Sequence, residues 1–180
     1  MTGKERRRLN PNRGLIKLCE RYADIFLSRF VYPFLAPLWN PYSWLLERRF
    51  GLAETKLSPA GWPSALAPLR ALLITDIHAG IFLNPETLWR IIRGLMTLKP
   101  DIVIIGGDLV SGHVSEAAPI LAGLAPLTRA PLGAWFCFGN HDYFGGDPEE
   151  LRKNLAAIGI RTLKNDSAVI HHRGGSFVLG

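Results

Sequence analysis

Side chains that can bind metal ions follow three short apolar runs of this sequence. In chain order they are Asp76, His78, Asp108, Asn140, His141 and Asp142. Carboxylate, imidazole and amide groups are the ligands that Mn, Zn, Fe and Mg sites use. Carboxylates that are brought close together repel each other unless a cation lies between them. If the three groups meet in space, the sequence therefore predicts a site for divalent metal ions.

The three groups meet only if the apolar runs are neighbouring strands of one sheet. Strands are expected within "LRALLIT" at 69–75, "DIVIIGGD" at 101–108 and "AWFCFGNHD" at 134–142. Neighbouring parallel strands present their carboxyl ends at one edge of the sheet, where ligands bind in α/β proteins. The glycines before Asp108 and Asn140 let the backbone turn sharply out of each strand.

Helices are expected between these strands. Asn84-Pro85 is a typical helix start, and the apolar residues after it recur on one helical face. A second helix is predicted over 115–127, and Asp147-Pro148 begins a third. Shorter strands are expected at 160–163, 167–172 and 176–179, the last two joined by a hairpin turn. The alternation predicts an α/β domain built from parallel βαβ units.

The basic charge of the chain lies at its N-terminal end. Residues 1–30 carry +5 of the net +6 at pH 7, so the remainder is close to neutral. A basic terminal segment attracts anionic lipid or nucleic acid. Nucleic acid is not expected as a partner, because the main domain shows no similar concentration of basic residues. Cys19 and Cys137 form no disulfide or metal motif and are expected to be buried.

An aromatic segment follows the basic one. Trp39, Tyr42 and Trp44 are of the kind that settles at the headgroup level of a membrane. The apolar stretch 25–39 is too short to cross a bilayer comfortably. Residues 1–50 are interpreted as a membrane-surface or partner-docking segment, or equally well as aromatics that pack on the main domain. Residues 51–68, rich in Ala, Pro, Gly and Ser, are expected to form a linker.

Three blocks of the sequence resemble a known family. "DIH" at 76–78, "GGD" at 106–108 and "GNHD" at 139–142 are similar to the first three signature blocks of the calcineurin-like metallophosphoesterases. The resemblance covers residues 69–180 and is greatest to a membrane-associated bacterial phosphohydrolase branch. A related branch cleaves the pyrophosphate of a lipid-linked nucleotide sugar. The resemblance implies a four-layer αββα sandwich, of which residues 69–180 would form the N-terminal part.

The resemblance also implies two divalent metal ions, whose identity among Mn, Zn, Fe and Mg the sequence leaves open. Asp76 and His78 would bind the first ion, Asp108 would bridge both, and Asn140 would bind the second. The implied reaction is the hydrolysis of a phosphodiester, pyrophosphate or phosphomonoester bond by a hydroxide that the two ions activate.

The same resemblance gives roles to the last two residues of the third block. His141 would lie beside the phosphate, as a proton donor to the leaving oxygen or as a transition-state stabiliser, and Asp142 would orient its ring. The substrate would be a phosphate ester or a lipid-linked pyrophosphate. Together with the basic, aromatic residues 1–50, this implies a cytoplasmic protein held peripherally at the membrane.

Further histidine blocks of the family are not found. His113, His171 and His172 lack the spacing of those blocks and are interpreted as loop and strand residues. The sequence ends in "FVLG", which resembles an interrupted strand, so a truncated parent enzyme is one hypothesis. A non-catalytic binding module or inactive fragment of this fold is the alternative. A nucleotide-binding α/β domain ranks last, because the sequence contains no GxGxxG motif and no P-loop.

Overall fold

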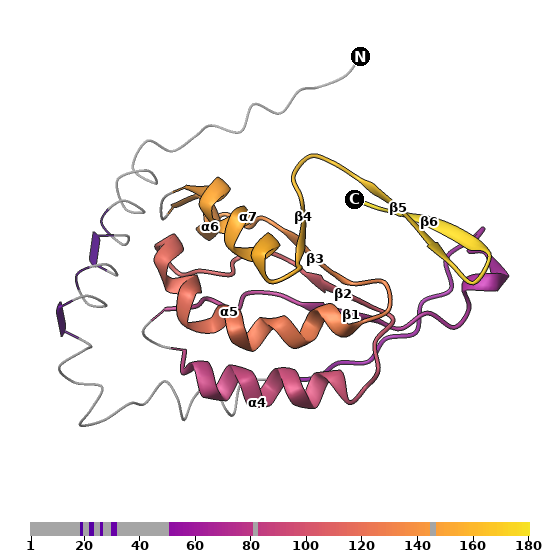
Figure 1. Cartoon of the computed structure of the whole chain (residues 1–180), viewed down its shortest axis with the longest axis horizontal. Coiled ribbons are helices and arrows are strands. Elements are labelled where there is room, and N and C mark those ends of the chain that lie inside the picture. The colour runs from indigo at the N-terminus through magenta and orange to yellow at the C-terminus, as the bar shows by residue number, and fades with distance from the viewer. Residues whose placement is uncertain are drawn as a thin grey trace, which may run out of the picture. The chain divides into compact units, whose positions relative to one another are not determined.

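The computed structural model describes residues 19, 22, 23, 26, 30 and 31 and residues 51–80, 83–144 and 147–180 (Figure 1). The chain divides into two units, Met1–Asn40 and Pro41–Gly180. The described residues of the first unit are helical. Among all described residues, no helix combines the length and the apolar character that crossing a membrane requires. The predicted interfacial aromatics at 39, 42 and 44 lie outside the described residues.

A four-stranded parallel sheet forms the centre of the second unit. Its strand order is β1 (Ala71–Ile74), β2 (Ile102–Ile105), β3 (Ala134–Cys137) and β4 (Arg161–Leu163). The register pairs Ile74 with Ile105 and Ile105 with Phe136, so β1, β2 and β3 end at the same edge. The predicted α/β class and the parallel arrangement are confirmed.

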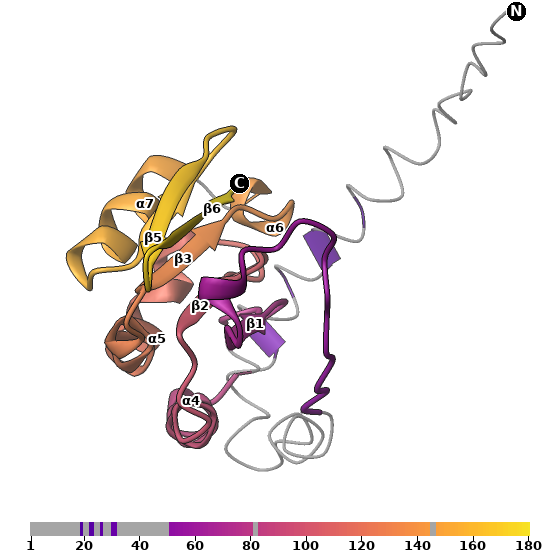
Figure 2. The same cartoon turned by 90° about the vertical axis from the view of Figure 1, so that its right-hand side faces the viewer.

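Helices α4 (Pro85–Met96), α5 (Ala118–Leu124) and α7 (Pro148–Ala157) follow one another along one side of this sheet (Figure 2). The side chains of Asn84 and Asp147 accept hydrogen bonds from backbone N–H groups two residues later, at 2.9 and 2.8 Å. These are the helix caps that the Asn-Pro and Asp-Pro pairs predict. Apolar residues of the helices and of alternate strand positions share one core, among them Leu88, Ile92, Ile120, Leu124, Leu151, Leu155, Leu72, Val103, Ile105 and Phe136.

The helix predicted over 115–127 is three short helices instead. They are η3 (Val114–Ala117), α5 and η4 (Ala125–Arg129). Pro119 and Pro126 are the second residues of α5 and η4. A proline has no N–H to donate and is tolerated only at such a helix start, so each proline marks a new helix.

An antiparallel hairpin covers part of the opposite face of the sheet. It consists of β5 (Ala168–His172) and β6 (Gly175–Leu179), as the sequence predicted. Ile170 of the hairpin is buried together with Ile102 and Trp135 of the sheet. Side chains alternate between the two faces of a strand, so these two sheet residues point away from the helices. The second unit therefore has a helical layer, a parallel sheet and a hairpin layer.

Part of the expected linker at 51–68 packs against this hairpin. Leu66, in the short helix η2 (Ser64–Leu66), is fully buried. The rings of Trp62 and Phe177 have centroids 5.5 Å apart. Arg173 donates a hydrogen bond to the carbonyl oxygen of Pro68 over 3.2 Å. The end of the linker is thus structured, although its composition is typical of a loop.

Both cysteines are exposed, so the expectation that they are buried was wrong. Cys137 is the last residue of β3 and follows the buried Phe136. Because side chains alternate along a strand, Cys137 lies on the face away from the helical core.

Candidate metal centre

Three of the predicted site residues converge beyond the carboxyl ends of β1, β2 and β3. His78, Asp108 and His141 each offer one ligand atom, and these atoms lie within 4.8 Å of one another. The two imidazole rings are nearly perpendicular, at 86°, with centroids 4.7 Å apart. All three residues are partly exposed, so solvent reaches them. Two imidazoles and a carboxylate in this arrangement suit a divalent cation.

The other two predicted ligands are more exposed. Oδ1 of Asp76 lies 3.8 Å from Nε2 of His78, and the Asp76 side chain is 66% exposed. Asn140 is exposed, and its backbone carbonyl accepts a hydrogen bond from the N–H of Tyr143 over 3.3 Å. The structure therefore places Asp76 beside His78, and metal binding by Asp76 and by Asn140 stays a prediction.

The backbone that carries these ligands has an unusual conformation. Asp76, His78 and Asp108 have φ angles of 55°, 48° and 50°. Residues with a Cβ atom rarely adopt this left-handed region, which costs on the order of 1–3 kcal/mol each. The N–H of His78 donates to the carbonyl of Asp108 over 2.9 Å, and the N–H of Ala79 donates to that of Leu109 over 2.7 Å. The two loops thus hold each other in the strained conformation.

Glycines allow the loops after β2 and β3 to touch. A Cβ atom on Gly107 would lie 2.5 Å from the backbone nitrogen of Gly139. A Cβ atom on Gly139 would lie 2.5 Å from the backbone nitrogen of Asp108 and would overlap its carboxylate. Both distances are shorter than any real contact of a Cβ atom, so larger residues at these two positions would push Asp108 away from the histidines.

Asp142 is buried and joins the same two loops. Its Oδ1 accepts hydrogen bonds from the N–H groups of Leu109 and Val110 over 2.8 and 3.3 Å. Its Oδ2 accepts from those of Asp108 and Gly139 over 2.9 and 2.8 Å. The resemblance gave Asp142 the task of orienting the His141 ring. In the structure, its two oxygens hold the backbone on either side of the site.

Ser111 connects the two histidines and carries no signal in the sequence. Its hydroxyl donates a hydrogen bond to the carbonyl oxygen of His78 over 3.0 Å. Its carbonyl oxygen lies 2.7 Å from Nδ1 of His141. A carbonyl oxygen only accepts hydrogen bonds, so Nδ1 of His141 carries a hydrogen. The backbone N–H of His141 in turn donates to Oδ1 of Asp108 over 2.8 Å.

The histidines that the sequence set aside lie elsewhere. His113 is the N-cap of η3, and its Nδ1 accepts a hydrogen bond from the N–H of Ser115 over 3.2 Å. His171 and His172 pair with Ser176 and Gly175 across the hairpin. Their interpretation as loop and strand residues agrees with these positions.

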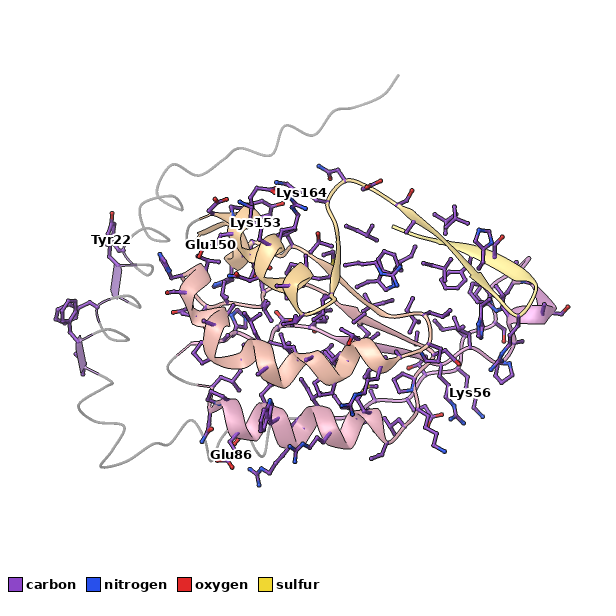
Figure 3. The ribbon with its side chains drawn as sticks, in the orientation of Figure 1. Tyr22, Lys56, Glu86, Glu150, Lys153 and Lys164 are labelled. Carbon is purple, nitrogen blue, oxygen red and sulfur yellow. The ribbon has the colours of Figure 1, made fainter. Side chains whose placement is uncertain are left out.

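Lys164 brings a positive charge to the loop after β3. Its Nζ lies 5.9 Å from the ring centre of Phe138 and 5.6 Å from that of Tyr143. It also lies 3.8 Å from Oε1 of Glu149. Figure 3 shows Lys164 near α7 and the short helix α6 (His141–Phe144).

Comparison with known proteins identifies similar sequences. Residues 69–174 match the calcineurin-like phosphoesterase family. A transmembrane protein with metallophosphoesterase domain from Danio rerio is 36% identical over 108 residues, which cover 60% of this chain and 24% of that protein. The UDP-2,3-diacylglucosamine pyrophosphatase of Chlamydia trachomatis is 35% identical over 99 residues, which cover 53% of this chain and 30% of the relative.

A solved structure is also similar. The nuclease MPE of Pseudomonas putida matches with a TM-score of 0.39 and 25% sequence identity, covering 52% of this chain and 47% of that one. The match to the two curated relatives spans between about a quarter and a third of their length.

Proposed function

The chain belongs to the calcineurin-like phosphoesterase family, and we propose that it hydrolyses phosphate esters with the help of divalent metal ions. The observation that carries this proposal is the convergence of His78, Asp108 and His141 at the ends of three parallel strands. Ligands gather at this edge of a parallel sheet because the loops there come from different strands.

In this proposal residues of all three sequence blocks bind the metal ions. Bound divalent ions supply a water of lowered pKa and neutralise charge on phosphate oxygens. Asp76 and His78 would hold the first ion, and Asn140 would hold the second. Asp108 would be shared between them, because a carboxylate offers two oxygens. The number of ions and the role of Asn140 rest on the family resemblance.

His141 acts on the substrate in this proposal. Its Nδ1 hydrogen is engaged by the carbonyl of Ser111, and in this proposal Nε2 would act on a phosphate oxygen rather than bind a metal ion. The neutral ring has no proton on Nε2. Proton donation to the leaving oxygen therefore requires the imidazolium form, whereas the neutral ring presents a lone pair.

Two names support the proposed substrate class. One relative is named as a UDP-2,3-diacylglucosamine pyrophosphatase, and the family name covers phosphoesters in general. We propose a phosphodiester or pyrophosphate substrate near a membrane, with a phosphomonoester as the other member of the class.

We also propose that the N-terminal unit places the protein peripherally at the cytoplasmic membrane surface. Tyr22, Phe26 and Phe30 are exposed by 64%, 58% and 58%. Their spacing of four residues puts them on one face of a helix, and the last two rings lie 5.5 Å apart. The +5 charge of residues 1–30 complements anionic lipid headgroups.

Sedimentation with lipid vesicles tests this placement. We expect the chain to bind vesicles that contain phosphatidylserine and to bind neutral phosphatidylcholine vesicles weakly. The double variant Phe26→Ser/Phe30→Ser should lose binding. Val169→Ser/Val178→Ser, which changes exposed apolar residues of the hairpin, should keep it. Equal binding by both double variants would contradict the placement.

Hydrolysis of bis(p-nitrophenyl) phosphate with Mn²⁺ tests the enzymatic proposal. Asp108→Asn should abolish turnover, because it removes one of the two bridging oxygens. Asp166→Asn is the matched control, since Asp166 is exposed and, among the described residues, its carboxylate accepts a hydrogen bond from the neighbouring Ser167 alone. Turnover that survives Asp108→Asn would refute the assignment.

A non-catalytic binding module is the second candidate. The observation in its favour is that the described residues bring together three ligand atoms, whereas two ions need more. Metal analysis of the dialysed protein together with the turnover assay separates the two. A dialysed protein with no bound transition metal, or with bound metal and no turnover, supports the module. Bound metal with turnover supports the enzyme.

A further inference from the structure

Six successive backbone N–H groups of loop 108–113 point at two carboxylates. Asp142 accepts hydrogen bonds from residues 108–110. Glu116 accepts from residues 111–113, over 3.1, 2.8 and 3.1 Å. Asp142 belongs to one of the three sequence blocks, whereas Glu116 lies outside all of them.

Glu116 also lies against the loop that follows β1. A Cβ atom placed on Gly80 would be 3.5 Å from the carboxyl carbon of Glu116 and 3.2 Å from the hydroxyl oxygen of Ser111. The N–H of Ser111 is shared between the carbonyl oxygen of Ala79, at 2.9 Å, and the Glu116 carboxylate. Glu116 and Ser111 are therefore packed into the junction of the loops after β1 and β2.

We propose that Glu116 is a positioning residue of the metal centre and acts through Ser111. Its carboxylate fixes the peptide of Ser111, whose hydroxyl holds the carbonyl of His78 and whose own carbonyl holds the ring of His141. Removal of Glu116 would weaken the support of both histidines at once, because the N–H of Ser111 would keep only its bond to the carbonyl of Ala79. The inference rests on the proposed function only in assuming that the centre binds a metal ion.

Glu116 has a simpler structural role, which the test must separate from this one. Its carboxylate completes the capping box at the N-terminus of η3. A cap alone contributes to stability, and its loss would leave metal affinity in the folded protein unchanged. Metal affinity and stability must therefore be measured separately.

Two variants of Glu116 remove its hydrogen bonds to different extents. All three hydrogen bonds end on the same atom, Oε2 of Glu116. Glu116→Gln can place its amide oxygen there and keep three neutral acceptor contacts. Glu116→Ala keeps none. Asp101→Ala is the control, because Asp101 also accepts a backbone N–H, that of Arg70 at 2.8 Å, but lies at the opposite end of β2.

The experiment titrates the full chain with Mn²⁺ by electron paramagnetic resonance and measures unfolding by urea in EDTA. Glu116→Ala should weaken Mn²⁺ binding by about 10-fold to 100-fold, the usual effect of losing an orienting partner of a ligand. Glu116→Gln should recover part of this loss. Asp101→Ala should lose stability and keep its Mn²⁺ affinity.

Two results would overturn the proposal, and they differ in what else they affect. If Glu116→Ala binds Mn²⁺ as tightly as the unaltered chain, the positioning role is wrong and the metal centre stands. If the unaltered chain binds no Mn²⁺, the proposed function fails together with the positioning role. Amide hydrogen exchange of residues 111–113 without metal tests the contact itself, and protection unchanged by Glu116→Ala would refute it.

Discussion

Single side chains hold the candidate centre together, and Asp142 is the clearest case. Each of its two carboxylate oxygens accepts two backbone hydrogen bonds. Glu116 accepts its three backbone hydrogen bonds with a single oxygen. An asparagine at 142 has an NH₂ group in place of one oxygen. That group cannot accept hydrogen bonds, so the two backbone N–H groups that face it lose their acceptor. Buried donors that lose their acceptor cost about 1–3 kcal/mol each.

Asp142→Asn should therefore lower the free energy of unfolding by about 2–6 kcal/mol, since two donors lose their acceptor. It should also weaken Mn²⁺ binding, because Asp108 moves with its loop. Urea unfolding in EDTA and Mn²⁺ titration measure the two effects. Asp101→Asn is the control, and an equal loss of stability in both variants would contradict the explanation.

The sequence indicated which candidate site residues converge better than it indicated the residues that support them. His78 and Asp108 as metal ligands and His141 as a catalytic residue were predicted because each follows an apolar run that ends in a glycine or a polar turn, and the structure brings the three together. Ser111 and Glu116 were missed because their partners belong to other loops. Ser111 forms a hydrogen bond to His78, which is 33 residues away in sequence. Neither periodicity nor local spacing can predict such a contact.

At the scale of elements, the packing of α4 on α5 depends on one glycine. A Cβ atom on Gly123 of α5 would overlap the indole of Trp89 on α4. Gly94 of α4 is exposed, and a Cβ atom there would meet nothing within 4 Å. Close packing against Trp89 therefore requires a glycine at 123, whereas no neighbouring atom requires one at 94. The sequence alone does not distinguish the two positions.

Gly94→Ala should raise the free energy of unfolding by about 0.5–1 kcal/mol, because alanine restricts the unfolded chain and favours helix. Gly123→Ala should lower it by about 1 kcal/mol or more, because the added methyl group displaces the Trp89 ring. Urea unfolding followed by circular dichroism measures both. A stabilising Gly123→Ala would show that the two helices separate easily.

Helix starts were the elements that the sequence predicted best. Asn84 and Asp147 cap their helices as expected, because a cap involves only neighbouring residues. Strand ends were predicted less well. β2 ends at Ile105, and the last two residues of the block at 139–142 belong to α6. The loop after β2 is held by a hydrogen bond to Asp142, which is distant in sequence, so local patterns do not show where the strand ends.

At the scale of the whole second unit, the sheet is covered on both faces by segments distant in sequence. Leu66 comes from the expected linker and is fully buried beside Gly175 of the hairpin. The linker composition predicted a loop, and only the tertiary contact with the hairpin reveals its packing. The parallel arrangement of the strands, in contrast, followed from the alternation of apolar runs and helices.

Leu66→Ala should lower the free energy of unfolding by about 2–5 kcal/mol, the range for a leucine removed from a core. Leu57→Ala is the matched control in the same segment, since Leu57 is 79% exposed. It should change stability by less than about 0.5 kcal/mol. Urea unfolding of the full chain measures both variants. If Leu66→Ala changed the free energy of unfolding as little as Leu57→Ala, the packing of segment 62–68 would not stabilise the fold.

The hydrogen bonds of Asp142 span 32 to 34 residues to reach the loop after β2. The centre therefore does not exist in a nascent or partly unfolded chain, and only a finished fold would bring its ligand atoms together. Ion uptake would then serve as a check on completed folding. A free ion concentration 100 times the dissociation constant would add about 2.7 kcal/mol to stability. A cell's supply of metal would thus set how much of this protein persists.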